Sequence, residues 1–242
     1  MPIIVVLVCW LLVCAPSWVW AAIDCVDAGA TEQHETPPAD PRTISYTTPS
    51  GSNLMTFVGF GYRNGGTRTS TTVTLAGNSM TAVLAQIYYN TIVGGGLYYY
   101  ANPPAGANDV VVDWEPTGAP TGSSIIIWTC SGVNLADPFR STNSASATDT
   151  TPTVTLSSIT TGDVAIDMVV SDDSTSLTVG TNQTVIHQGV GGSHTGGASY
   201  QAGADGGIMS WTTGASDDWA TLAAALKPAQ TDDAGGTPIW FP

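Results

Sequence analysis

Short apolar runs, each closed by Gly, Asn, Asp or Pro, follow one another along most of the chain. In Thr71–Leu75 and Thr153–Leu156 apolar residues alternate with threonine, which is the two-residue period of a strand buried on one face. Many short strands at close spacing are typical of a sandwich or a barrel, and we predict an all-β fold, an antiparallel β-sandwich. The predicted strands are Thr43–Thr48, Leu54–Tyr62, Thr71–Leu75, Ala82–Tyr89, Leu97–Ala101, Asp109–Trp114, Ser124–Cys130, Thr153–Leu156, Asp163–Val170, Ser176–Val179, Gln183–His187, Gly197–Ala202, Gly207–Thr212 and Trp219–Leu226.

Two of these runs, Ser124–Trp128 and Asp163–Val170, are almost continuously apolar. This pattern predicts central strands that are packed on both faces. One other stretch, Ser216–Lys227, has helix-forming alanines and an N-cap candidate in Ser216. It is short, ends before Pro228 and closes an otherwise β chain, so we predict that it forms the last core strand.

The first residues of the chain form an uninterrupted apolar run with no Lys or Arg. Val19 and Ala21 suit the −3 and −1 positions of a signal-peptidase site, which predicts a signal peptide over residues 1–21. The alternative is an uncleaved membrane anchor, for which a helix broken by Pro16 is short. We therefore expect a secreted protein, located outside the cell or on its surface.

The remaining chain is predicted to contain three parts. Residues 22–42 are polar and proline-containing and form an entry linker or a first edge strand. Residues 43–228 form a single β-sandwich domain, and no internal repeat is evident within it. Residues 229–242 are an acidic, Gly-rich tail that ends in an apolar hexapeptide. Its residues Ile239, Trp240 and Phe241 either fold back onto the sandwich or dock onto a neighbouring subunit or partner.

Five basic residues stand against nineteen acidic ones, for a formal charge of −14. Such a chain is repelled by nucleic acid and by anionic membrane surfaces, so we expect neither as a partner once the signal is removed. Neutral sugars, cations and protein surfaces, including a second copy of the chain, remain as partners. Two cysteines follow the predicted cleavage site, Cys25 and Cys130. They either pair in an oxidising compartment or stay separate, with Cys130 as a small buried residue.

Several segments together resemble a group of uncharacterised secreted and phage-associated β-sandwich domains. These segments are Gly77–Thr81, Leu97–Ala107, Cys130–Asn134 with Asp137–Phe139, and Ser216–Pro228. The resemblance covers about residues 50–228 and implies a jelly roll similar to concanavalin-like lectins and carbohydrate-binding modules. It implies little about function, because sandwich folds host unrelated activities.

Aromatic residues offer one candidate site for a ligand. Alternate members of the run Tyr98, Tyr99 and Tyr100 must point to opposite faces of a strand, so at least one is expected at the surface. Together with Trp114 these rings could stack on a sugar. The alternative is that they only stabilise a hairpin by packing across strands.

Acidic turns offer a second candidate site, for Ca²⁺, which prefers several oxygen ligands. The alternative is that these turns are solvated loops that bond to their own backbone. The candidate ligands are Asp172, Asp173, Asp205, Asp217 and Asp218.

No residue pattern points to catalysis. The chain has three glutamates, Glu32, Glu35 and Glu115, and lacks the Glu-x-Asp-x-x-Glu motif of sandwich-fold glucanases. The first hypothesis is therefore a non-catalytic secreted binding or surface module, with carbohydrate as the expected ligand. The second is a structural subunit of an extracellular or virion-like assembly, and a glycan-active enzyme comes third.

Overall fold

The computed structural model describes residues 19–34, 40–63, 70–90, 92–115, 120–172, 176–191 and 194–231. Within this part of the chain the protein is all-β, and its one helical element is the short 3-10 helix η1, Gly203–Asp205. The strands are β1 Val19–Trp20, β2 Asp24–His34, β3 Arg42–Thr48, β4 Met55–Arg63, β5 Ser70–Leu75, β6 Asn78–Ser79, β7 Thr81–Tyr89, β8 Val93–Ala101, β9 Gly106–Glu115, β10 Gly122–Ser131, β11 Phe139–Asp149, β12 Thr153–Thr155, β13 Val164–Ser171, β14 Thr178–Val179, β15 Thr184–Gly191, β16 His194–Ala202, β17 Ile208–Thr212, β18 Asp217–Leu226 and β19 Gln230–Thr231. Each of the fourteen predicted runs overlaps one of these strands.

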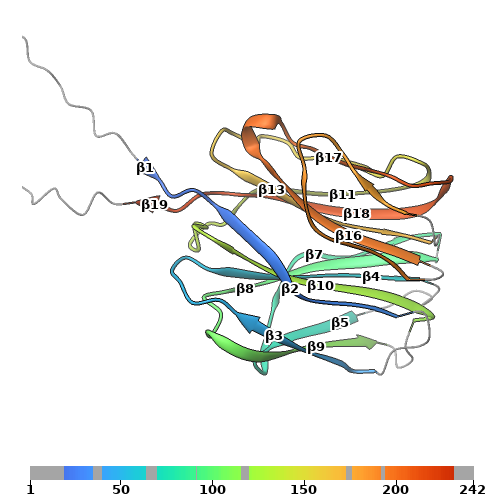
Figure 1. Cartoon of the computed structure of the whole chain (residues 1–242), viewed down its shortest axis with the longest axis horizontal. Helices are drawn as coiled ribbons and strands as arrows, with labels where there is room; N and C mark the ends of the chain where they lie inside the picture. The colour runs from blue at the N-terminus through green and yellow to red at the C-terminus, as the bar shows by residue number, and fades with distance from the viewer. Residues whose placement is uncertain are drawn as a thin grey trace, which may run out of the picture.

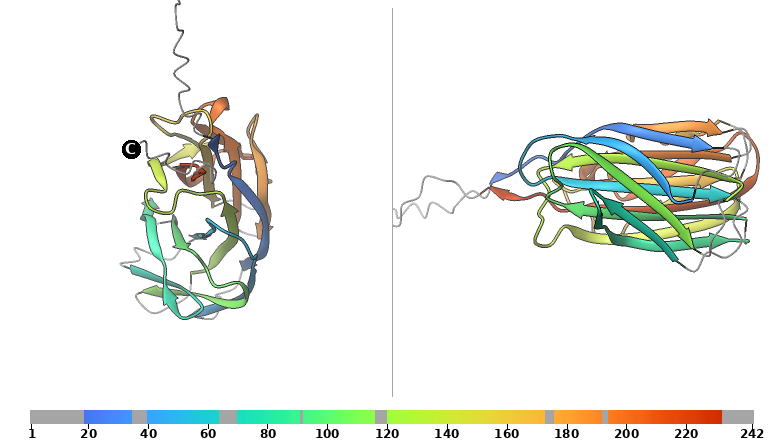
Figure 2. Two further views of the ribbon diagram at one scale, coloured as in Figure 1. Left: turned by 90° about the vertical axis from the view of Figure 1, so that its left-hand side faces the viewer. Right: turned by 90° about the horizontal axis from the view of Figure 1, so that it is seen from below.

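Four antiparallel sheets lie on top of one another (Figure 1). From the bottom of the view, sheet 1 is β3-β9-β5-β6, sheet 2 is β2-β10-β4-β8-β7, sheet 3 is β11-β18-β13-β16-β15 and sheet 4 is β12-β17-β14. A separate pair, β1 with β19, extends from one end of the stack and contains the first and last described residues (Figure 2). The predicted antiparallel sandwich is therefore confirmed, in a form with two additional outer layers.

Three layers of apolar side chains hold the stack together. Sheets 1 and 2 enclose a cluster that includes Phe60 and Trp114, and sheets 2 and 3 enclose the largest cluster, which includes Trp128 and Met168. Sheets 3 and 4 enclose smaller clusters, one of them around Trp211. The central strands of the inner sheets are consequently buried on both faces, as the continuous apolar runs of β10 and β13 predict.

Strand β18 confirms that Ser216–Lys227 contributes a core strand, despite its helix-forming composition. Its neighbours on both sides are strands β11 and β13. Leu222 and Ala224 face sheet 2, whereas Ala223 and Ala225 face sheet 4. Alanine fits here because both faces are covered by another layer, and burial outweighs the intrinsic helix preference of the segment.

The chain builds the same arrangement of strands twice. Unit 1, β2 to β10, forms sheets 1 and 2, and unit 2, β11 to β18, forms sheets 3 and 4. Apart from the short β6, each unit has eight strands, and along the chain these are distributed between its two sheets in the same sequence. The order of strands within the inner sheets also corresponds, β2-β10-β4-β8-β7 in unit 1 and β11-β18-β13-β16-β15 in unit 2. In each unit the first strand pairs with the last and the second with the seventh, which is the winding of a jelly roll.

The terminal predictions fall mostly outside the described residues. Residues 1–18 of the predicted signal peptide lie outside them, as does the tail from residue 232 with Ile239, Trp240 and Phe241. At the predicted cleavage site, Val19–Trp20 pairs with Gln230–Thr231, and the Ala21 amide donates to the Ala229 carbonyl at 3.0 Å. Cleavage after Ala21 would remove β1 from this pair. Among the described residues no helix has the length and hydropathy needed to cross a membrane.

Candidate functional site

Cys25 and Cys130 form a disulfide that fastens edge strand β2 to central strand β10. The two residues are directly opposite each other in the antiparallel pair, with Cα atoms 4.0 Å apart. Both are buried against the cluster between sheets 2 and 3. Of the two alternatives left open by the sequence, the structure therefore contains the pairing.

The aromatic candidates contribute mainly to the core. Trp114 is completely buried between sheets 1 and 2, and Tyr98 is buried there with its hydroxyl donating to the Thr71 carbonyl at 3.0 Å. Tyr100 packs on the edge of the same cluster. Tyr99 lies on the opposite face, edge-on to Phe139 with ring centroids 5.1 Å apart. Trp114 and Tyr98 thus have no surface on which a sugar could stack.

The acidic candidates divide between the two ends of the stack. Asp172, Asp217 and Asp218 come together where β13 ends and β18 begins, because the Asp172 amide donates to the Asp218 carbonyl. Asp205 follows β16, whose last residue Ala202 pairs with Val164 at the other end of β13. Asp173 lies outside the described residues.

Each of the three neighbouring carboxylates is paired with a different donor. Asp172 forms an ion pair with Arg63, and Asp217 accepts a hydrogen bond from the Ser171 hydroxyl at 2.6 Å. Asp218 accepts from the hydroxyl of Thr148 and, at 3.2 Å, from the side-chain amide of Asn90. Among the described residues no group of three or more His, Cys, Asp or Glu side chains is placed to hold a metal ion. Because Asp173 lies outside the described residues, the Ca²⁺ site stays a prediction.

A buried carboxylate lies between sheets 3 and 4. Asp167 is fully buried, and its Oδ1 accepts hydrogen bonds from the backbone amide and the hydroxyl of Ser199, at 2.9 and 2.7 Å. Its Oδ2 accepts from the indole Nε1 of Trp211 at 2.7 Å. Burial raises the pKa of Asp167 to about 7, against the lowering effect of these hydrogen bonds. The network joins β13 and β16 of sheet 3 to β17 of sheet 4 and thereby stabilises the contact between these layers.

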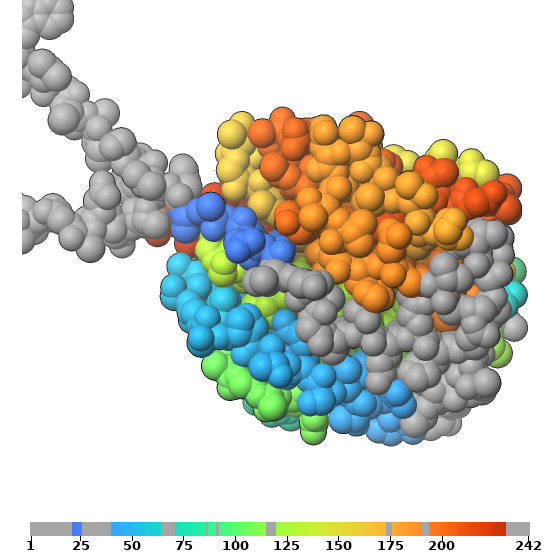
Figure 3. All heavy atoms as spheres, in the orientation of Figure 1, coloured from blue at the N-terminus to red at the C-terminus, as the bar shows by residue number. Residues whose placement is uncertain are grey.

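Open surface with polar lining occurs instead at the end where β1 and β19 leave the stack. Two adjacent pockets of about 350 and 500 Å³ share Asn53. In Figure 3 blue, light-blue and yellow-green atoms meet at this end, which are the colours of the parts of the chain that contain residues 21–22, 49–54 and 131–136. We call the two pockets together the amide groove. Its lining residues are Ala21, Ala22, Pro49, Ser50, Gly51, Ser52, Asn53, Leu54, Ser131, Gly132, Asn134, Leu135, Ala136, Ala229 and Gln230.

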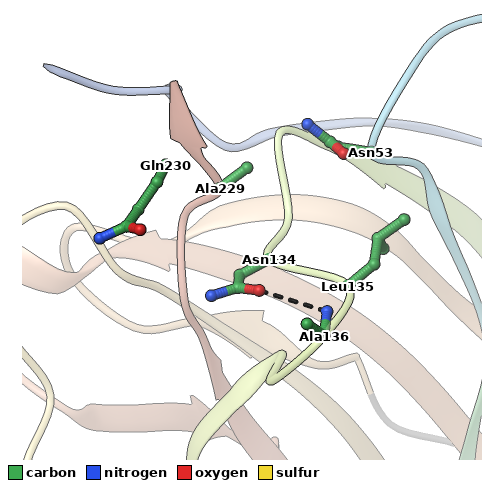
Figure 4. Close-up of a pocket in the computed structure, with 6 residues that line it drawn as sticks. All are labelled: Asn53, Asn134, Leu135, Ala136, Ala229 and Gln230. Carbon is green, nitrogen blue, oxygen red and sulfur yellow. Dashed lines mark hydrogen bonds between the residues drawn. The ribbon is translucent and has the colours of Figure 1, made fainter. Parts of the chain in front are cut away.

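Three side-chain amides from distant segments converge on the groove (Figure 4). Asn134 forms an Asx turn, in which its Oδ1 accepts from the backbone amides of Ala136 and Asp137 at 3.2 and 3.3 Å. This turn uses only the oxygen, and Figure 4 shows the amide nitrogen directed away from Ala136. Asn53 and Gln230 are exposed and add further donors and acceptors.

The backbone around the groove is held by hydrogen bonds between the same segments. Asn53 has a left-handed backbone, with φ of 54°, and its carbonyl accepts from the Val133 amide at 3.2 Å. Gly132 has φ of 71°, and a Cβ atom there would lie 2.4 Å from the Ala22 carbonyl oxygen. The Ala229 amide donates to the Gly132 carbonyl at 2.7 Å. These bonds position the 49–54, 131–136 and 229–230 segments without a ligand, whereas cleavage after Ala21 would remove one lining residue and make Ala22 the first residue.

No protein-family model matches the chain, and neither the curated proteins nor the solved structures include a significant match. The resemblance to concanavalin-like lectins therefore stays a prediction.

Sequence reasoning did not identify the amide groove. Cys130–Asn134 belongs to the segments that carry the resemblance, but no property of Asn53, Asn134 or Gln230 singles them out among the polar loop residues. They meet only because β10 and β18 end side by side, where Val133 bridges to Pro228.

Proposed function

We propose that the protein is a non-catalytic extracellular binding module that holds a neutral glycan in the amide groove. The observation that carries this proposal is the set of amide and hydroxyl side chains in the groove, which stand among apolar residues with no charged side chain. Side-chain amides both donate and accept hydrogen bonds, as sugar hydroxyls do. The two pockets have the volume of typical small-ligand sites and share Asn53, which suits an extended ligand.

The chemistry of the lining supports binding over catalysis. Among the described residues that border the groove, none has an ionisable side chain. Glycoside hydrolysis requires a pair of carboxyl groups across the bond that is cleaved. The disulfide supports an extracellular location, since such bonds persist in oxidising compartments. The charge of −14 disfavours polyanionic glycans.

Asn134→Asp and Gln230→Ala test the proposal on an array of neutral oligosaccharides, followed by calorimetric titration of the best ligand. The Asn134→Asp variant would keep the oxygen of the Asx turn and lose the amide donor, so we expect unchanged thermal stability and about three- to tenfold weaker binding. Gln230→Ala removes an exposed side chain and should have a similar effect.

The matched control is Asn182→Asp, which makes the same substitution at an exposed asparagine outside the groove. It should bind as the unmodified protein does. The proposal fails if no neutral glycan binds, or if Asn134→Asp and Asn182→Asp have equal affinities.

A role as a structural subunit of an extracellular assembly is a second candidate. It is favoured by the position of β19, the last described strand, which lies beside the groove at one end of the stack (Figure 1). Truncation after Thr231 would preserve β19 and remove the apolar hexapeptide. If residues 232–242 join neighbouring copies, the full chain should be oligomeric by size-exclusion chromatography with light scattering and the truncated chain monomeric. A full chain that is monomeric at high concentration would contradict this role.

A further inference from the structure

The two units share more than their strand order. Strands β8 and β16 carry the related runs Val93–Ala101 and His194–Ala202, in which Gly95 and Gly196 hold the same place. In unit 1 Gly95 pairs with Gly61, and in unit 2 Gly196 pairs with Val170. Gly61 and Val170 are therefore equivalent positions. The same registers make two further pairs equivalent, Gly59 with Met168 and Arg63 with Asp172.

Equivalent positions face each other across the contact between sheets 2 and 3. A Cβ atom added at Gly61 would lie 2.5 Å from Val170 Cβ, and one added at Gly59 would lie 3.1 Å from Met168 Cγ. Arg63 and Asp172 form an ion pair. An isologous interface brings equivalent residues together along its twofold axis, so β4 and β13 lie alongside each other on such an axis between the units.

Contacts away from β4 and β13 have the same symmetry. Strand β8 contacts β18 as β16 contacts β10, and β7 contacts β11 as β15 contacts β2. The segments that follow β10 and β18 also pair with each other, through Val133 with Pro228 and through the Ala229 amide on the Gly132 carbonyl. The chain thus has the contact pattern of a twofold dimer.

At this axis the paired residues are complementary and not alike. Glycine in unit 1 meets Met168 or Val170 in unit 2, and a cation meets an anion. A second copy of unit 1 would place glycine on glycine, leaving a void, and Arg63 on Arg63. A second copy of unit 2 would place methionine on methionine, valine on valine and Asp172 on Asp172. Voids, overlap and like charges all disfavour such pairings.

We propose that the two units are mutually selective partners, so that the chain is a covalently joined heterodimer. The inner face of each unit fits the other unit and rejects a copy of itself. The connection through residues 132–138 then serves to raise the local concentration of the two units and is not needed for their recognition. The disulfide does not join the units, because both of its cysteines belong to unit 1.

To test this proposal, a protease site is inserted into the full chain between the exposed residues Ala136 and Asp137. The protein is first folded and then cut at this site into unit 1 and unit 2. We expect the two pieces to elute together in native buffer. After unfolding in urea and dilution they should reassemble into a one-to-one complex, with no homodimer of either piece by native mass spectrometry. Pieces that separate in native buffer, or a piece that pairs with itself, would overturn the proposal.

Charge reversal in the cut protein tests the selectivity. Arg63→Asp alone and Asp172→Arg alone should each raise the dissociation constant about tenfold or more, because like charges then meet at a partly buried site. The double variant exchanges the residues at equivalent positions and should return to within about threefold of the parent. Asp109→Arg, on the exposed side of sheet 1, is the control and should leave the constant unchanged.

A size exchange gives an independent second test. Gly61→Val should weaken association through overlap with Val170, and Gly61→Val with Val170→Gly should restore it, because the exchange is symmetric about the axis. Formation of the Cys25–Cys130 disulfide reports that unit 1 folds in each variant. If neither double variant recovers affinity over its single variants, the units are not mutually selective and the proposal is wrong.

Discussion

Replacement of both Cys25 and Cys130 by alanine should lower the free energy of unfolding by about 4–5 kcal/mol in the chain-entropy account of a closed loop this long. The two cysteines are 105 residues apart in sequence, and the bond encloses all of unit 1 from β2 to β10. Because β2 is an edge strand bonded only to β10, it should be the first element to open when the bond is lost. Chemical denaturation measures the loss, and hydrogen exchange along β10 locates it.

The reduced parent protein is the matched comparison for this variant. Dithiothreitol should destabilise the parent by a similar amount and leave the double-alanine variant unaffected. The chain-entropy account would be contradicted if the free energy of unfolding of the variant lay within about 1 kcal/mol of that of the oxidised parent. The bond would then contribute little to stability.

Asp167→Asn should remove a pH dependence of stability. The pKa of Asp167 is raised by burial from 3.8 to about 7 in the folded protein, so between these values the folded state binds more protons than the unfolded state. The free energy of unfolding therefore falls as pH rises through this window, by as much as about 4 kcal/mol from this one group. Asparagine does not titrate, and the fall should be absent in the variant.

Urea denaturation at intervals from about pH 4 to about pH 8 covers the window in which the protonation of Asp167 affects stability. The proteins compared are the parent, Asp167→Asn and, as a control at an exposed position, Asp109→Asn. The asparagine variant should be the less stable protein at the acidic end, because its amide nitrogen cannot accept the hydrogen bond of Trp211. Its disadvantage should shrink or reverse at the alkaline end. Parallel curves for the parent and Asp167→Asn would contradict the role of this carboxylate.

The strands were predictable because most of them face a core on at least one side. Burial imposes alternation on Thr71–Leu75 and a continuous apolar run on Ser124–Trp128, and both patterns are visible in the sequence. Strand β11 was not predicted, since it is an edge strand whose residues are almost all polar or small and partly exposed. The edge-strand alternative for residues 22–42 corresponds to β2.

The doubled architecture could not be predicted from the sequence. Most equivalent positions carry different residues, and those at the axis differ most, as Gly61 and Val170 do. Complementary packing between the units requires different residues at equivalent positions. The residues that join the units therefore show no sequence repeat by which the two units could be recognised. The related runs of β8 and β16 are short and glycine-rich, which is a common composition in turns and strands alike.

The sites were harder to predict than the strands, for a physical reason. Exposure of Tyr98 or Trp114 depends on whether a further sheet covers them, and the sequence contains no direct signal for the outer layers. Of the candidate acidic residues, Asp172, Asp217 and Asp218 lie close together, but each is paired with a donor such as Arg63, Ser171 or Asn90 from another part of the fold. Grooves made of three distant loops are visible only in the folded chain.

Because the central strands β4, β10, β13 and β18 are buried almost throughout, they offer hardly any position at which a mutation could reach a ligand. Natural variation in recognition, or an engineered specificity, is therefore confined to the outermost sheets, to edge strands such as β11, and to the loops at the two ends. Libraries for altered binding should randomise the 49–54 and 134–136 loops and leave β4, β10, β13 and β18 untouched.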